Sequence, residues 1–265
     1  MLDKFNREIN YLRISVTDRC NLRCIYCMPE KGIHLMNHNE ILRYEEIEAV
    51  VKESAALGIN KIRLTGGEPL TRKNIENLIE KISNINEIDH LSLTTNGTLL
   101  ADKAETLKKA GLNSINISLD TLDSERYEKI TRGGNIKDVL EGIESAIDNN
   151  FLIKLNMVVL KDLNRDEIEN MKKFCNVRNI KLQLINHFNL NAQKQDSYKF
   201  DRPPKCSSCN RIRLLSNGVL KPCLHSDMEY EINFENIIDS LKQTILAKPE
   251  KGLLCSLKQM VEIGG

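Results

Sequence analysis

Six of the eight cysteines stand in two close-set groups, one near each end of the chain. The first group is Cys20, Cys24 and Cys27, and the second group is Cys206, Cys209 and Cys223. A chain of 265 residues builds its core without disulfides, so grouped cysteines indicate metal binding. The other two, Cys175 and Cys255, are expected to be ordinary buried thiols.

Three thiolates leave the identity of the metal open. An iron–sulfur cubane held by three cysteines keeps one iron free to bind another molecule, whereas a structural zinc ion takes four protein ligands. At the first set the fourth zinc ligand would be His34 or His38, and three buried thiols without a metal are a further alternative. At the second set His225 would complete a tetrahedral zinc site.

The composition fits a globular protein with no strong charge of either sign. The chain has 38 lysines and arginines against 37 aspartates and glutamates, a formal net charge of +1, with 41% hydrophobic and 28% charged residues. This balance gives no reason to expect nucleic acid or a membrane as a partner, and it excludes disordered, collagen-like and coiled-coil classes. The polar N-terminus and the lack of a long apolar run predict a cytoplasmic protein.

Strands and helices are expected to alternate along most of the chain. Runs rich in β-branched and apolar residues predict strands over 11–16, 60–67, 89–97, 114–120, 153–161 and 179–186. Apolar residues at helical spacing predict helices over 44–58, 74–85, 103–111 and 136–150. This alternation predicts an α/β fold with a parallel sheet and crossover helices, most simply a full or partial (β/α) barrel.

A polar stretch after Asn186 is expected to connect the barrel to a compact region that carries the second cysteine set. Asn217-Gly218 between two apolar runs predicts a hairpin there. One hairpin is not stable alone, so it is expected to dock on the barrel, followed by a helix over 234–246. We therefore expect a barrel over 1–190 and a connector with a small cysteine-containing extension over 191–265.

Polar segments stand where three of the predicted strands end. They are Thr65-Gly66-Gly67-Glu68, Thr94-Thr95-Asn96-Gly97 and Ser118-Leu119-Asp120. Taken singly, each is more simply a turn or a strand end. A barrel places its chemistry at the C-terminal ends of its strands, so together with the first cysteine set these segments indicate one site.

The first cysteine set, with an aromatic residue before its last cysteine, resembles the cluster motif of the radical S-adenosylmethionine (SAM) superfamily, and Gly66-Gly67-Glu68-Pro69 resembles its GGEP element. The resemblance implies a partial (β/α)6-type TIM barrel in which the three cysteines hold a [4Fe-4S] cluster. The open iron would bind SAM, which reduction cleaves to methionine and a 5′-deoxyadenosyl radical. The residues that the resemblance assigns to the SAM site are Tyr26, Gly66, Gly67, Glu68, Thr94, Asn96 and Ser118.

The second cysteine set resembles the C-terminal site of the GTP 3′,8-cyclases, the radical SAM family that begins molybdenum cofactor synthesis. Other matching segments include LRISVTDRCNLRCIYCMP, IRLTGGEPLTRK, CNRIRLLSNGVLKPCLHS and the terminal IGG. The resemblance implies a second [4Fe-4S] cluster, whose open iron meets the guanine ring, and a Gly264-Gly265 end that reaches into the active site. The adenosyl radical would remove hydrogen from ribose C3′ of GTP, and C3′ would then attack guanine C8 to give 3′,8-cyclo-7,8-dihydro-GTP.

A triphosphate substrate requires fixed cations. The basic residues that the resemblance assigns to GTP are Arg13, Lys61, Arg63, Lys154, Arg211 and Arg213. Arg211 and Arg213 could instead form the solvated face of the hairpin. The resemblance also implies a reductant protein as a partner, and the next enzyme of the molybdopterin pathway is a further expected one.

The chain is shorter than typical members of that family, and the difference falls between the strand at 179–186 and Cys206. On this strand family members carry an arginine that faces the substrate, where this chain has Gln183, and Lys181 is expected to face the other side. A neutral amide binds phosphate far more weakly than a guanidinium does. Two alternatives therefore remain: a related radical SAM enzyme acting on another nucleotide or a peptide, and a zinc-stabilised binding protein.

Overall fold

The computed structural model describes residues 1–195, 198–200 and 203–264. Its centre is a nine-stranded sheet with the order β6-β5-β4-β3-β2-β1-β7-β8-β9. β1 to β7 are parallel to one another, and β8 and β9 add antiparallel strands at the edge next to β7. The strands are β1 Tyr11–Ser15, β2 Lys61–Thr65, β3 His90–Thr95, β4 Ser114–Ser118, β5 Leu152–Val159, β6 Lys181–Asn186, β7 Arg211–Leu214, β8 Val219–Lys221 and β9 Tyr230–Glu231.

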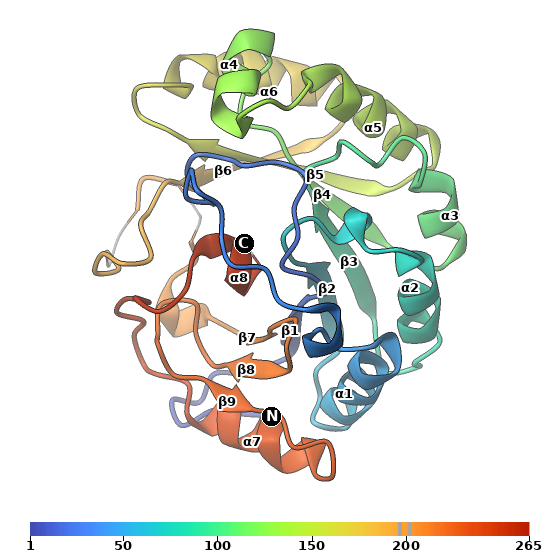
Figure 1. The fold of residues 1–265 in the computed structure, drawn as a ribbon, viewed down its shortest axis with the longest axis vertical. Coiled ribbons are helices and arrows are strands. Elements are labelled where there is room, and N and C mark those ends of the chain that lie inside the picture. The colour runs from blue at the N-terminus through green and yellow to red at the C-terminus, as the bar shows by residue number, and fades with distance from the viewer. Residues whose placement is uncertain (196–197, 201–202, 265) are drawn as a thin grey trace.

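Helices follow the strands around the outside of the curved sheet, while the C-terminal α8 lies inside the curve (Figure 1). The helices are α1 Tyr44–Ala56, α2 Ile75–Ser83, α3 Ala104–Lys109, α4 Ser124–Thr131, α5 Ile136–Asp148, α6 Ile168–Val177, α7 Ile237–Leu246 and α8 Met260–Ile263. Short 3-10 turns are η1 His38–Glu40, η2 Pro69–Thr71, η3 Arg165–Glu167 and η4 Cys206–Ser208. The six predicted strands and four predicted barrel helices are present close to their predicted ranges, and the predicted partial barrel is confirmed.

The parallel strands alternate between an apolar outer face and a polar inner face. One register row of the outer face is fully buried and consists of Ile14, Leu64, Leu93 and Ile115. A row of the inner face consists of Arg13, Arg63, Ser92 and Ser114. Burying each outer aliphatic side chain contributes about 1.5–3 kcal/mol, so the outer face fixes the register. Parallel sheets are usually apolar on both faces, so the polar inner face is available for binding.

The C-terminal hairpin extends the same sheet. β7 pairs in parallel with β1, and Arg13 is the register partner of Arg213. Gly218 has a φ of +86° in the turn between β7 and β8, which the predicted Asn-Gly hairpin requires. The predicted docking of the hairpin on the barrel is therefore confirmed, and α7 occupies most of the predicted helix at 234–246.

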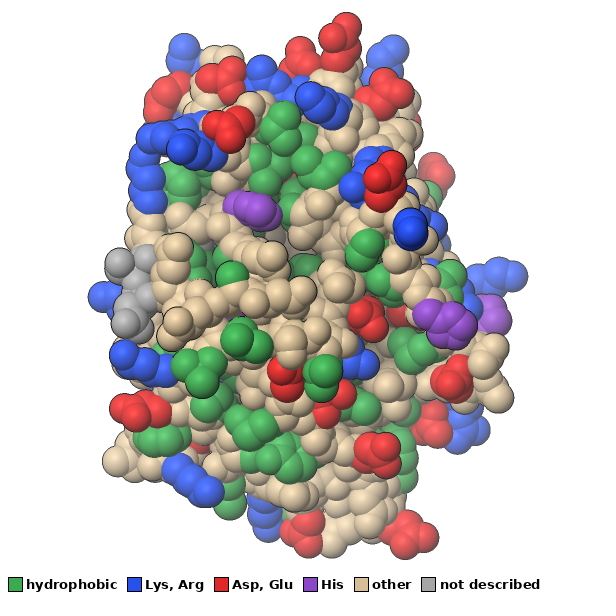
Figure 2. All heavy atoms as spheres, turned by 60° about the vertical axis from the view of Figure 1, so that its left-hand side comes forward, with side chains coloured by type: hydrophobic (Ala, Val, Ile, Leu, Met, Phe, Trp, Pro, Cys, Tyr) green, Lys and Arg blue, Asp and Glu red, His purple; other side chains and the backbone are tan. Residues whose placement is uncertain are grey.

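Two barrel helices, α4 and α6, were not predicted from the sequence. α4 has only eight residues, and it is capped at its N-terminus by Asp123, whose side chain accepts the backbone N–H of Arg126 at 2.7 Å. Its buried residues, Tyr127, Ile130 and Thr131, make too short an apolar pattern to stand out among charged neighbours. Among the helices described, none is long and apolar enough to span a membrane. Acidic and basic side chains are interspersed on the face that Figure 2 shows, in keeping with the balanced composition.

Candidate active site

The loop that carries the first cysteine set leaves the C-terminal end of β1 and lies against the end of α4. Arg23 donates its backbone N–H to the carbonyl of Thr131, and Ile25 donates to that of Ile130, both at 3.0 Å. Arg132 ends α4 in a left-handed conformation, and its guanidinium donates to the carbonyl of Arg23 at 3.0 Å. The last carbonyls of a helix have no partner inside it, so the end of α4 is suited to hold this loop.

The three thiols of the first set are close enough to act on one another electrostatically. Burial, followed by the charges of Cys20 and Asp120, raises the pKa of Cys27 to about 12. Burial and then Asp120 raise the pKa of Cys24 well above its usual value. Within the described ranges, no three His, Cys, Asp or Glu side chains already converge as metal ligands. The cysteines would turn inward to share a cluster, and its positive irons would stabilise the crowded thiolates, so the set fits a cluster.

Gly66 and Gly67 let the end of β2 pack directly on the backbone that leads into the cysteine loop. A Cβ atom at Gly67 would lie 2.2 Å from the carbonyl oxygen of Arg19, and one at Gly66 would lie 2.6 Å from that of Thr17. The N–H of Gly67 donates to Thr17 at 2.8 Å, and the N–H of Glu68 donates to Arg19 at 2.7 Å. Only glycine permits this approach, so the Gly-Gly pair fixes where the cysteine loop begins.

Glu68 is almost fully buried, with 1% of its surface exposed, and it ties the ends of β2 and β3 together. Its carboxylate accepts hydrogen bonds from the Thr95 hydroxyl and the Asn96 N–H at 2.7 Å, and from the Leu70 N–H at 2.9 Å. Burial raises the pKa of Glu68 to about 7, although these donors favour the ionised form. Both carboxylate oxygens are thus engaged by the protein, and Glu68 positions Asn96.

The other residues expected at the SAM site lie on strand ends around the cysteine loop. The side-chain amide of Asn96 contacts the sulfur of Cys20 at 3.9 Å. Thr94 accepts a hydrogen bond from the guanidinium of Arg63 at 3.2 Å, and Ser118 ends β4 half-buried. A cavity of about 200 Å³ opens beside Cys20. The structure therefore brings the first cysteine set and the three strand ends together.

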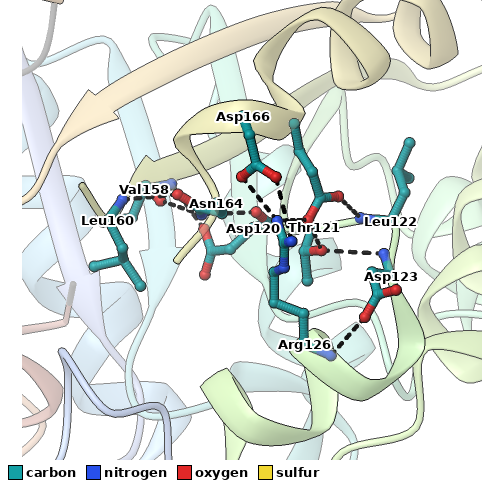
Figure 3. A network of polar contacts seen from close by, with 10 residues as sticks. Asp120, Thr121, Leu122, Asp123, Arg126, Val158, Leu160, Asn164 and Asp166 are labelled. Atoms are coloured by element: carbon teal, nitrogen blue, oxygen red, sulfur yellow. Dashed lines mark hydrogen bonds and ion pairs between the residues drawn. The ribbon is translucent and has the colours of Figure 1, made fainter. Parts of the chain in front are cut away.

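Tyr26 reaches from the cysteine loop to the end of β4. Its hydroxyl donates to one carboxylate oxygen of Asp120 at 2.7 Å, and the other oxygen accepts the backbone N–H of Val158 at 2.7 Å. The side-chain amide of Asn164 donates to the carbonyls of Asp120 and Val158 at 2.7 and 2.8 Å, as Figure 3 shows. Burial raises the pKa of Asp120 to about 6. This network locks the loop to two strand ends.

Sequence reasoning did not assign Asp120 or Asn164 to the site. Asp120 stands in a polar strand end that the sequence analysis recognised, so its position was the available signal. Asn164 follows β5 in a segment with no predicted element. Nearby, Arg126 forms an ion pair with Asp166 at 2.9 Å, which joins α4 to the turn before α6 (Figure 3).

The inner face of the sheet brings three expected phosphate-binding arginines together. Arg13 is the register partner of Arg63 on β2 and of Arg213 on β7. Burial, followed by the charge of Arg213, lowers the pKa of Arg13 well below its usual value, and burial lowers the pKa of Arg213 to about 10. Adjacent buried guanidiniums are costly unless an anion neutralises them. This row therefore suits a strongly anionic ligand.

The remaining expected cations are more dispersed. Arg211 lies over the ring of Tyr11, 5.4 Å from its centre, and Lys61 is exposed at the start of β2. Lys154 is half-buried on β5, opposite Asn116 of β4. Arg211 and Lys61 stand on β7 and β2, two strands of the arginine row itself, whereas Lys154 stands on β5, beyond β3 and β4. The structure therefore does not gather all six cations into one cluster.

The C-terminal segment enters the barrel. The carbonyl of Gly264 accepts hydrogen bonds from Arg13, Thr65 and Arg213 at 3.0, 3.2 and 3.4 Å. A Cβ atom at Gly264, where φ is +74°, would lie 2.8 Å from the methyl carbon of Thr65. The penultimate glycine therefore stands beside the arginine row, while Gly265 lies outside the described residues.

Gln183 takes the inner-face position on β6 that was expected to carry an arginine. Its side-chain amide donates to the side-chain oxygen of Asn156 on β5 at 2.9 Å. The expectation that Lys181 faces the other side was wrong, because residues two apart on a strand share a face. Lys181 is the register partner of Lys154, so β5 and β6 bring two lysines to neighbouring positions.

The second cysteine set lies at the opposite end of the strands from the first. Two of its members precede β7, and Cys223 follows β8, whereas the first set follows β1, the parallel neighbour of β7. Because β1 has five residues, the two sets lie on the order of 15 Å apart along the strand direction. The arginine row of β1, β2 and β7 stands between them.

The residues around the second set can enclose a metal group. A Cβ atom at Gly252 would lie 2.9 Å from the sulfur of Cys223, so the backbone closes tightly over this thiol. His225 is 3% exposed, and within the described chain neither of its ring nitrogens has a hydrogen-bond partner. A buried imidazole without partners indicates a site for a ligand. The donors fit a three-cysteine cluster, and they also fit zinc with His225 as the fourth ligand.

Comparison with known proteins assigns the family. Residues 14–175 match the radical SAM superfamily. The GTP 3′,8-cyclases of Clostridium botulinum (strain Langeland / NCTC 10281 / Type F) and Alkaliphilus metalliredigens (strain QYMF) are 43% identical to this chain over 321 and 320 aligned positions, covering 100% of each chain.

Two solved structures share the fold. They are native anSMEcpe with bound AdoMet (TM-score 0.64, 17% identity, 91% of this chain and 81% of that chain) and Streptococcus suis SuiB bound to S-adenosylmethionine (TM-score 0.65, 17% identity, 82% and 60%). Together with the full-length relatives, the barrel and its cysteine loop lead to one assignment: the chain belongs to the radical SAM superfamily and, within it, to the family of the GTP 3′,8-cyclases.

Proposed function

We propose that this enzyme cyclises GTP by joining ribose C3′ to guanine C8, giving 3′,8-cyclo-7,8-dihydro-GTP for molybdenum cofactor synthesis. The observation that carries the proposal is the row formed by Arg13, Arg63 and Arg213 on the inner face of the barrel. It lies between two cysteine sets, where a triphosphate would neutralise guanidiniums that otherwise repel one another. The purine would then extend towards the second set and the ribose towards the first.

The chain's own residues bind and orient the reactants. Cys20, Cys24 and Cys27 would hold the [4Fe-4S] cluster, which supplies the electron that cleaves SAM to methionine and a 5′-deoxyadenosyl radical. Asn96 stands at the sulfur of Cys20, positioned by Glu68, where it would contact bound SAM. The buried inner face would keep water from the radical and hold C3′ close to it, which converts a bimolecular encounter into an oriented one.

The second cluster is part of the proposal. Cys206, Cys209 and Cys223 would hold it, and its open iron would take the guanine ring. Zinc bound by the same cysteines and His225 is the competing assignment. Iron, sulfide and zinc analysis of anaerobically purified protein separates the two, since two clusters require about eight irons per chain and no zinc.

The test of activity is an anaerobic assay with SAM, dithionite and GTP. We expect 5′-deoxyadenosine and a cyclised nucleotide in equal amounts, and we expect Cys24→Ala to abolish both. SAM cleavage that occurs without GTP conversion would contradict the proposed substrate. Unchanged cleavage in the Cys24→Ala enzyme would contradict the cluster assignment.

A changed substrate is the second candidate, favoured by two observations. The alignments to the relatives extend over 321 positions against 265 residues here, and Gln183 supplies an amide where an arginine was expected. 5′-Deoxyadenosine formed with another nucleotide or a peptide, and not with GTP, would establish this alternative. In either case a reductant protein would deliver the electron. With GTP as the substrate, the next enzyme of the molybdopterin pathway would receive the product.

A further inference from the structure

The polar connector that follows β6 brings a lysine to the second cysteine set. The ammonium group of Lys194 donates to the sulfur of Cys206 at 3.2 Å. This lysine lies in the shortened region of the chain, and its position in the sequence indicates no role. A neutral thiol is a weak acceptor, whereas a thiolate bound to iron would make this a charge-assisted hydrogen bond.

Backbone hydrogen bonds of the connector hold Lys194 beside the second cysteine set. Its N–H donates to the carbonyl of Leu253 at 2.6 Å, and the N–H of Leu253 donates to the carbonyl of His225 at 2.9 Å. The neighbouring residue Gly252 is in contact range of Cys223, where a Cβ atom would lie 2.9 Å from the sulfur. Backbone hydrogen bonds thus link the connector, through the segment around Leu253, to the segment that follows Cys223.

The two cysteine sets differ in the charge of their surroundings. The first set has the carboxylates of Asp120 and Glu68 near its thiols, together with the guanidinium of Arg23. Near the second set are Lys194, Arg211 and the buried Lys248, whose ammonium donates to the carbonyls of residues 211 and 222 at 2.8 Å. Charges of this kind, and hydrogen bonds to cluster sulfurs, set the reduction potential of an iron–sulfur cluster.

We propose that Lys194 raises the reduction potential of the cluster held by Cys206, Cys209 and Cys223. This inference rests on the proposed second cluster. Adding an electron makes the cluster more negative, and a nearby ammonium that donates to a ligand sulfur stabilises the reduced form more than the oxidised one. The connector would therefore keep the second cluster easier to reduce than the first, which lies among carboxylates.

The test is a potentiometric titration of the complete, iron-loaded protein, followed by electron paramagnetic resonance. The titration step that disappears in Cys223→Ala belongs to the second cluster. We expect Lys194→Met to lower the reduced-to-oxidised ratio of that step at least tenfold at a fixed potential, equal to about 59 mV for one electron. The step of the first cluster serves as the internal reference, and Lys194→Arg should keep the wild-type potential.

Lys199→Met is the matched control, because this exposed lysine of the same connector packs on the ring of Phe200. An unchanged second step in Lys194→Met would overturn the inference, as would an equal shift in Lys199→Met. If the Met variant loses iron, Lys194→Gln, which keeps a donor without the charge, takes its place. Loss of iron in both would show that the lysine holds the cluster and does not tune it. A wild-type protein with only about four irons would instead refute the proposed second cluster.

Discussion

At the scale of single residues, the site depends on close backbone contacts and on buried polar side chains. Gly67 lets the end of β2 pack against the backbone of Arg19. Glu68 accepts the backbone N–H of Asn96 and so positions its side-chain amide next to the sulfur of Cys20. These contacts make the position of the first cysteine a consequence of strand packing. A small displacement of the backbone at Gly67 should therefore also move the cysteines that would hold the cluster.

Gly67→Ala tests this dependence. The new Cβ would meet a carbonyl oxygen at 2.2 Å, and neither backbone can yield without moving the loop. We expect a loss of about 3 kcal/mol in the free energy of unfolding, together with reduced iron content after reconstitution. The control is Gly32→Ala in the same loop, where nothing lies within 4 Å of the new Cβ and only the cost of a positive φ, about 1 kcal/mol, applies. Equal effects of the two changes would refute the packing account.

Gln183→Arg tests the substrate assignment at one position. Gln183 donates to Asn156 on the inner face, and Lys154 and Lys181 occupy the preceding register position. An added guanidinium should tighten GTP binding by about 1.5–3 kcal/mol, and it should lower the stability of the ligand-free protein through repulsion by the lysines. Anaerobic calorimetry measures the affinity, with Gln193→Arg on the connector as the control. If the affinity for GTP is unchanged, the phosphates of GTP do not bind near position 183.

At the scale of elements, the cysteine loop is held by neighbours that come from distant parts of the chain. The strands, the Gly-Gly turn and the cysteine spacing could be read from the sequence because each depends on local pattern. The anchoring of the loop on α4 could not, since the carbonyls of residues 130 and 131 carry no sequence signal. The hydrogen bond between Tyr26 and Asp120 could not be predicted from local sequence pattern either, because it joins residues 94 positions apart.

Tyr26→Phe tests the contribution of that pairing. Removing the hydroxyl leaves the buried carboxylate of Asp120 with one donor fewer, which should cost about 1–3 kcal/mol of stability. The loss should grow as pH rises through the pKa of Asp120, near 6, because the ionised form needs the donor most. Urea unfolding at pH 5 and pH 8 measures the loss of stability and its dependence on pH. Tyr44→Phe removes a hydroxyl that donates to the carbonyl of Lys73 at an exposed site, and it should show neither effect.

At the scale of the whole molecule, the two ends of the chain are joined through one sheet. β7 is hydrogen-bonded to β1, and the guanidinium of Arg7 donates to the carbonyls of Cys206 and Pro249 at 3.0 and 2.7 Å. The C-terminal region thus covers an edge of the barrel that would otherwise present unpaired backbone groups and buried aliphatic side chains to water. The expected division at residue 190 separates parts that share this sheet.

This continuity predicts that the C-terminal strands unfold together with the barrel. In native-state hydrogen exchange, peptides from β1 and β7 should open with the same free energy, because neither strand keeps its backbone partners when the other leaves. A fragment of residues 1–190 should accordingly lack a cooperative urea transition, since the exposed edge of β1 would lose its parallel neighbour and Arg13 would lose the carbonyl of Gly264 as an acceptor. Exchange of β7 at a clearly lower free energy than β1, combined with a fragment that melts cooperatively, would mean that the barrel is complete by itself and that the cysteine-bearing extension is added to it.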